Sequence, residues 1–129
     1  MGKILLKRIY EAPARGDGYR VLVERLWPRG MSKDKAALDE WLKDIAPSDA
    51  LRRWYGHEPA RWPEFRRRYR AELASADDIL DGLLRHLARR NVTLLFAARD
   101  EARNSAVVLK SVLEKRSGAT PAARRKTAT

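Results

Sequence analysis

Three apolar runs along the chain have the length and composition of buried β-strands. They cover residues 3–9, 19–24 and 92–98, and polar or glycine-containing segments separate them. The second run, Tyr-Arg-Val-Leu-Val-Glu, has a nearly continuous apolar centre, which is typical of a strand covered on both faces. The third, Val-Thr-Leu-Leu-Phe-Ala-Ala, is the strongest strand signal in the sequence.

Other segments carry helical spacing or residues that begin and end helices. Ser32 and Ser48 are placed to cap helices, and Gly56 is placed to end the second of these. Apolar residues recur at helical spacing over 62–73, and residues 75–78 resemble a capping box. Helices are therefore expected from residue 33, over 48–55, over 62–73, after the capping box, and over about 101–115.

The segment from Leu38 to Ile45 satisfies the helical pattern better than the strand pattern. Leu38, Trp41, Leu42 and Ile45 recur at helical spacing, whereas alternation fits residues 41–45 poorly. Periodicity alone favours a helix here.

The order of these elements predicts an α/β domain with a short, mostly parallel sheet flanked by helices. The chain has 129 residues, which suits one domain. We assign the domain to residues 1–115, because residues 116–129 are rich in Ser, Ala, Thr and Pro and lack apolar periodicity. Such a segment does not bury enough apolar surface to offset its ordering entropy, so we expect a disordered basic tail.

The amino-acid composition excludes some classes of function but does not identify one. The net charge is +11, and a basic surface attracts polyanions but also simply keeps a protein soluble. The sequence contains no cysteine, which excludes disulfides, thiolate metal sites and a cysteine nucleophile. No signal peptide is recognisable and no apolar run approaches the roughly 20 residues of a membrane helix, so we expect a cytoplasmic protein with no membrane partner.

Several long blocks of the sequence occur in the same order as in a known protein family. They are Leu6–Tyr10, Val21–Gly30, Asp39–Ser48, Leu51–Trp54 with His57, and Thr93–Asp100 with Asn104. These blocks resemble the YeaO-like family of small bacterial domains of unknown function, and the resemblance covers residues 4–115. It implies a compact three-layer, Rossmann-like α/β fold and no agreed reaction. It also favours a strand, rather than a helix, over Trp41–Ile45.

The turn after the second strand is the best candidate for a binding site. Arg25 and Arg29 flank a Trp-Pro pair, and Gly30 follows directly. Guanidinium groups suit phosphate and carboxylate, and ligands of open α/β sheets bind beyond the C-terminal ends of the strands. The competing interpretation is structural, with Arg25 paired to an internal carboxylate such as Asp39 or Glu40.

The end of the last strand is expected to face the same crevice. Arg99 is a candidate anion clamp there, and Asn104 follows in the same block. Lys43 would point into the crevice if its segment is a strand, and would otherwise be an ordinary solvated lysine. Asp39 and Asp100 are the acids considered for catalysis, although a carboxylate at a helix N-terminus, as at Asp100, more often caps the helix.

Other chemistry has little support in the sequence. The two histidines, His57 and His86, are far apart, so no metal site is expected. His57 follows a helix end and suits the helix dipole, and His86 lies outside the apolar stripe of its helix and is expected to be solvated. No phosphate-binding loop, dinucleotide fingerprint or nucleophile elbow is present, and no cofactor is expected.

The sequence thus predicts a small anionic ligand, phosphorylated or carboxylated, and leaves open whether the protein is an enzyme. The residues expected to bind it are Arg25, Arg29, Gly30, Lys43, Arg99 and Asn104. The alternative is nucleic-acid binding without catalysis through the Arg-rich helix 61–70 and the basic tail. In that helix the aromatic residues recur at core spacing and Glu64 is placed to pair with arginines, so a plain solvated face competes with this alternative. Nothing in the sequence indicates the oligomeric state.

Overall fold

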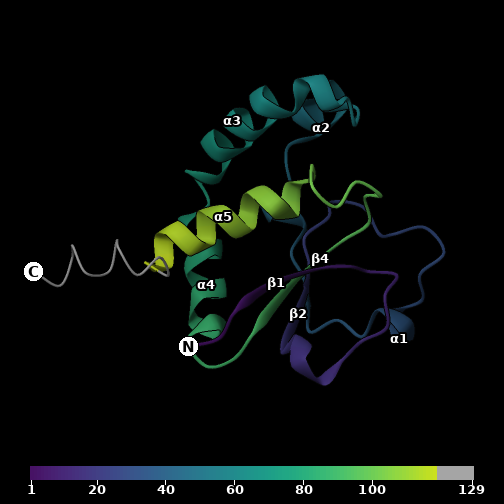
Figure 1. The fold of residues 1–129 in the computed structure, drawn as a ribbon, viewed down its shortest axis with the longest axis vertical. Coiled ribbons are helices and arrows are strands. Elements are labelled where there is room, and N and C mark those ends of the chain that lie inside the picture. Colours follow the sequence, from purple (N-terminus) through teal and green to yellow (C-terminus); the bar gives the residue numbers. More distant parts are fainter. Residues whose placement is uncertain (119–129) are drawn as a thin grey trace, which may run out of the picture.

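The computed structural model describes residues 1–118 of the chain, and within them four parallel strands form one sheet. The strands are β1 (Ile4–Arg8), β2 (Tyr19–Leu22), β3 (Glu40–Trp41) and β4 (Val92–Phe96). Their order is β1-β4-β2-β3, with β4 paired to both β1 and β2. Figure 1 labels β1, β4 and β2. The predicted α/β class with a short parallel sheet is confirmed.

Four helices cover one face of the sheet. They are α2 (Asp49–Tyr55), α3 (Trp62–Leu73), α4 (Asp77–Leu87) and α5 (Ser105–Ser117). Helices α4 and α5 contact the strands directly, and α3 packs on α5 and α2 (Figure 1). The main core lies between these helices and the sheet, where Val21, Leu94 and Leu109 have no exposed surface.

The opposite face is covered mainly by a loop. Here Leu22 and Leu95 are fully buried together with Ala36 of the single-turn helix α1 (Lys33–Ala36). Trp27 and Trp41 pack on this cluster, with their rings edge to face at 5.2 Å. The sheet is therefore covered on both faces, as its apolar strands predicted, with a third layer made of loop and one helical turn.

Most predicted helix boundaries are confirmed. The Ser32 hydroxyl accepts the N–H of Lys35, and the Ser48 hydroxyl accepts the N–H of Leu51. Gly56 ends α2 with a left-handed φ of 52°.

Three helix boundaries differ from prediction. The capping box at 75–78 is not formed, since Ala76 is the N-cap of α4 and provides no side-chain hydrogen bond. Helix α5 begins at Ser105 rather than near residue 101, because the Asn104 side chain caps it by accepting the N–H of Val107. The helix also continues to Ser117, and Arg116, assigned above to the tail, forms ion pairs with Asp77 and Asp81.

The rest of the expected tail, residues 119–129, lies outside the described residues. No helix within residues 1–118 combines the length and apolar character that a membrane span requires.

Residues 41–45 form neither the helix nor the full strand that was considered. The β3 strand stops at Trp41, and a 3₁₀ turn follows over Lys43–Ile45. The β2 strand offers only two residues for pairing, opposite Glu40 and Trp41. Beyond them the chain turns inward, so that Ile45 is buried and its carbonyl accepts a 2.6 Å hydrogen bond from the Tyr69 hydroxyl.

Candidate functional site

A crevice of about 510 Å³ lies beyond the C-terminal ends of β2 and β4. Its walls come from the loop after β2, the end of α2, the two residues after β4 and the start of α5. The polar and charged side chains that line it belong to Tyr10, Glu24, Arg25, Arg29, Arg52, Arg53, Tyr55, His57, Asn104 and Ser105. The structure thus brings together the predicted Arg25, Arg29 and Asn104 with several residues that were not predicted.

The charges lining this crevice are strongly unequal. Four arginines and His57 face one acidic residue, Glu24. Arg52 and Arg53 were not among the residues predicted to bind the anion, although both lie in a block shared with the YeaO-like family. They are adjacent on α2, and only the packing of α2 against the loop after β2 places them opposite Arg25 and Arg29.

Arg25 is held largely by the protein itself. Its guanidinium lies 3.4 Å from the carbonyl oxygens of Ala46 and Pro47 and 3.7 Å from the Asp49 carboxylate. The internal acid beside Arg25 is therefore Asp49, rather than Asp39 or Glu40. Arg52 lies 3.4 Å from the same Asp49 carboxylate, so Asp49 offsets the charge of two of the four arginines.

The side chains of Arg29 and Arg53, unlike those of Arg25 and Arg52, are not held by other residues in the described part of the chain. Within residues 1–118 their guanidinium groups form no hydrogen bond or ion pair. The backbone near Arg29 is nevertheless fixed, because its carbonyl accepts a 3.1 Å hydrogen bond from the Tyr10 hydroxyl. Gly30 supplies the positive φ of 75° that this turn requires but does not line the crevice. Two cations are thus available to a ligand at this site.

Glu24 is the acid that sequence reasoning missed. Its carboxylate accepts a 2.9 Å hydrogen bond from the N–H of Ala97, the first residue after β4. Burial raises the pKa of Glu24, partly opposed by that hydrogen bond and by the nearby His57 and Arg52. The available signal was a carboxylate at the end of an otherwise apolar strand, where ligands of α/β sheets bind.

Asn104 and Asp100 organise the segment between β4 and α5. Asn104 is buried; its amide donates to the Asp100 carbonyl at 2.9 Å while its oxygen caps α5. The Asp100 carboxylate accepts the N–H groups of Ala102 and Arg103, both at 3.0 Å, and these bonds lower the pKa of Asp100. Asp100 therefore caps a turn and does not line the crevice.

The remaining predicted residues also lie outside this crevice. Asp39 precedes β3, at the opposite end of the sheet, and its carboxylate accepts the N–H of Arg20 at 2.8 Å. The Lys43 ammonium lies 4.2 Å from the centre of the Trp41 ring, and Arg99 is exposed. Among the described residues, no cluster of three or more His, Asp or Glu side chains is placed to hold a metal ion.

Comparisons with known proteins agree with the resemblance described above. The family described as the inactive DUF488-N3 subclade matches residues 3–128. The uncharacterized protein YeaO of Escherichia coli K12 is 42% identical over 106 residues, which cover 82% of this chain and 92% of YeaO. The uncharacterized protein Rv3073c of Mycobacterium tuberculosis H37Rv is 43% identical over 115 residues, which cover 88% of this chain and 96% of that protein. No solved structure matches the chain. The chain therefore belongs to the YeaO-like family, in the DUF488-N3 subclade that is described as inactive.

Proposed function

We propose that the crevice at the strand ends binds a small anionic metabolite carrying a phosphate or carboxylate group. The observation that carries this proposal is the pair Arg29 and Arg53, whose guanidinium groups line a cavity without a partner among residues 1–118. Arginine presents a rigid fork of N–H donors that matches the oxygens of phosphate and carboxylate. Arg25 and Arg52 add positive potential, and Asp49 holds them in place.

Glu24 makes this binding dependent on pH. An ionised Glu24 repels an anion in the crevice, whereas a protonated one does not and can donate a hydrogen bond. Because burial raises the pKa of Glu24 above the ordinary glutamate value of 4.5, this carboxylate takes up its proton at a higher pH than an exposed glutamate does. The affinity for an anion is therefore expected to rise as the pH falls through the pKa of Glu24.

The proposal concerns binding rather than turnover. The acids considered for catalysis, Asp39 and Asp100, already accept backbone hydrogen bonds and do not line the crevice. The description of the subclade as inactive points the same way.

A thermal-shift screen of the full chain against phosphorylated and carboxylated metabolites tests this function. A ligand at 100 times its dissociation constant should add roughly 2.7 kcal/mol, which is several degrees for a domain of this size. Arg29→Gln and Arg53→Gln should abolish the shift caused by a selective ligand. Arg66→Gln, which removes another exposed charge, on α3, should leave it unchanged. Equal shifts with every polyanion, or the absence of any selective shift that is lost in both crevice variants, would overturn the proposal.

Nucleic-acid binding is the second candidate, and the exposed face of α3 is the observation in its favour. Arg66 and Arg70 have no side-chain partner within residues 1–118, whereas Arg67 and Arg68 pair with Glu64. Phe65 and Tyr69 are buried, so this face would contact the phosphate backbone rather than stack on bases. This function predicts affinity that falls steeply with salt, survives Arg53→Gln and is reduced in Arg66→Gln. The two candidates therefore give opposite results with the same two variants.

A further inference from the structure

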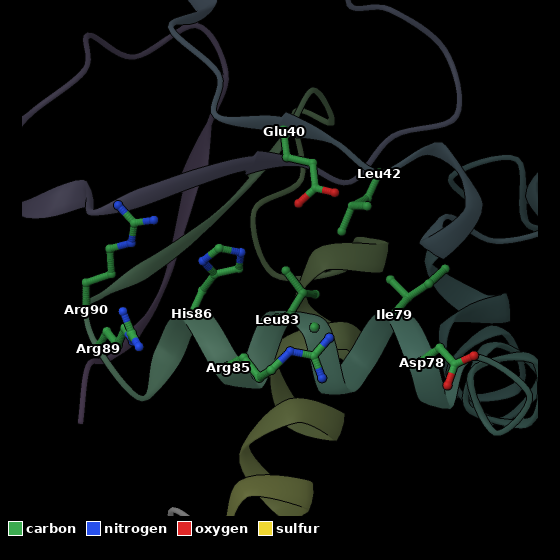
Figure 2. A pocket seen from close by; sticks show the side chains of 10 residues that line it. Glu40, Leu42, Asp78, Ile79, Leu83, Arg85, His86, Arg89 and Arg90 are labelled. Atoms are coloured by element: carbon green, nitrogen blue, oxygen red, sulfur yellow. The ribbon is translucent and has the colours of Figure 1, made fainter.

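A second cavity, of about 650 Å³, opens between the β3 edge of the sheet and α4. Figure 2 shows Glu40 and Leu42 pointing toward α4, and Ile79, Leu83 and His86 pointing back toward them. Leu42, Ile79 and Leu83 are the large apolar residues of its lining. Asp78 lines it at the N-terminal end of α4, and His86 and three arginines line it at the C-terminal end. This cleft is separate from the crevice at the strand ends, because no residue lines both.

Two polar side chains of this cleft, His86 and Glu40, are held in place by Tyr19. The His86 ring stacks on the Tyr19 ring, with centroids 3.7 Å apart and planes 11° from parallel, so His86 is not simply solvated as expected. The Tyr19 hydroxyl donates a 2.7 Å hydrogen bond to one oxygen of Glu40. Burial and the Glu40 carboxylate raise the pKa of Tyr19 to about 12. The Glu40 carboxylate is therefore oriented before any ligand arrives.

Positive charge gathers at one end of the cleft. Arg85, Arg89 and Arg90 all line it from the last turn of α4 and the residues just after it. The Arg90 guanidinium lies over the Tyr19 ring, 4.9 Å from its centre, whereas the guanidinium groups of Arg85 and Arg89 form no hydrogen bond or ion pair within residues 1–118. The helix dipole also favours cations here, but it does not account for three arginines around a cavity of this size.

Gly82 keeps the cleft open. It lies inside α4, where glycine is a poor helix former, and it lines the cavity. A Cβ atom at this position would meet only the Arg85 guanidinium, at 3.7 Å, so a side chain here would enter open space.

We propose that this cleft binds a mononucleotide. The Glu40 carboxylate only accepts hydrogen bonds, so the ligand must present N–H or O–H donors to it. The flat His86 ring and the leucines suit a planar base, and Arg85 and Arg89 suit a dianionic phosphate. Guanine fits best because its adjacent N1–H and N2–H₂ groups both donate to one carboxylate. Uracil fits worst because carbonyl groups flank its single N–H.

Calorimetric titration of the full chain with GMP, UMP, guanosine and inorganic phosphate tests the proposal. GMP should bind at least about tenfold more tightly than UMP, guanosine or phosphate alone, since each of these lacks one favourable contact. Gly82→Leu should abolish GMP binding without lowering the melting temperature, because leucine is the better helix former and fills the cleft. Glu40→Gln should remove the preference for GMP over UMP, and Arg89→Gln should weaken both.

Two matched controls separate this site from the others. Arg53→Gln alters the strand-end crevice and Arg66→Gln alters the exposed face of α3, and neither should change GMP affinity. Absence of GMP binding, equal affinity for GMP and inorganic phosphate, or GMP binding that persists in Gly82→Leu would each overturn the proposal. Binding of an oligonucleotide without binding of GMP would overturn it in favour of the basic surface.

Discussion

The Glu24 carboxylate accepts a hydrogen bond from the N–H of Ala97, 2.9 Å away, and so connects the residues that follow β2 and β4. These are neighbouring strands of the sheet, although the two residues are far apart in the sequence. The bond places a half-buried acid in a crevice whose other charged side chains are arginines and a histidine. The stability of the domain and the charge of the crevice are therefore coupled through one side chain.

Replacement of Glu24 by glutamine should stabilise the protein at neutral pH. Because burial raises the pKa of Glu24, the folded state binds its proton more tightly than the unfolded state does. This contribution to stability is complete below the ordinary value of 4.5 and is lost as the pH rises through the folded-state pKa. Glu24→Gln cannot ionise and still accepts from Ala97. The melting temperature of the Glu24→Gln variant should exceed that of the wild type at neutral pH, and this difference should shrink as the pH falls toward 4.5. A difference that grows on acidification would contradict the predicted role of Glu24.

Removal of the Tyr69 hydroxyl should destabilise the domain more than removal of the Tyr55 hydroxyl. Tyr69 is 1% exposed and donates to the Ile45 carbonyl at 2.6 Å, so Tyr69→Phe leaves a buried acceptor without its donor. We expect a loss of about 1–3 kcal/mol in urea unfolding. The Tyr55 hydroxyl donates to the Arg103 carbonyl at 3.0 Å in a partly exposed position beside the crevice. Tyr55→Phe is the matched control and should lose less, because water can replace the hydroxyl.

The buried ion pair of Asp17 and Arg20 should be one of the most sensitive points of the fold. Arg20 is 5% exposed and also donates to the carbonyls of Ala36 and Ala37. Asp17→Ala leaves the buried Arg20 guanidinium without its carboxylate partner and should lower the free energy of unfolding by about 3–5 kcal/mol. A double-mutant cycle with Arg20→Met isolates the pair, and additive losses would show that the two residues act independently.

Protonation of Asp17 should contribute to the unfolding of the domain at low pH. Burial acts to raise the pKa of Asp17, but hydrogen bonds from Ala14, Lys7 and Arg20 lower it below its ordinary value of 3.8. Its stabilising contribution is therefore present above pH 3.8 and is lost as the pH falls through the folded-state pKa. Asp17→Asn should flatten the acid limb of the stability curve measured by urea unfolding. An unchanged slope would show that other carboxylates govern acid unfolding.

Two glycines with similar backbone conformation should respond differently to alanine. Gly18 has φ +63°, and a Cβ there would overlap the Asn91 carbonyl; Gly56 has φ +52°, and its Cβ would lie 3.6 Å from the Arg53 carbonyl oxygen. Gly56→Ala should lose about 1–2 kcal/mol from the left-handed conformation alone. Gly18→Ala should lose clearly more, because the backbone of Asn91 must also move. Equal losses in thermal unfolding would contradict the contribution of that contact.

Local signals in the sequence determined the strands and most helices of this protein. Val92–Phe96 and Tyr19–Leu22 are apolar enough to be buried wherever the chain folds, and Ser32 and Ser48 cap helices through bonds to residues three positions away. Such bonds depend on neighbouring residues alone. The 41–45 segment was ambiguous because its form depends on β2, which pairs with only one of its residues, Trp41.

Tertiary structure decided which residues share a site. Arg52, Arg53 and Glu24 lie near Arg25 and Arg29 only because α2 packs beside the loop after β2. His86 stacks on the Tyr19 ring only because α4 packs on a face of the sheet. Asp39 lies at the other end of the sheet because it precedes its strand, whereas the crevice lies where the strands end. The spacing of residues along the chain determines which face of a helix or strand each side chain lies on. The distance between side chains on two different elements depends on how the apolar faces of those elements pack. That packing brought the charged residues of the crevice together.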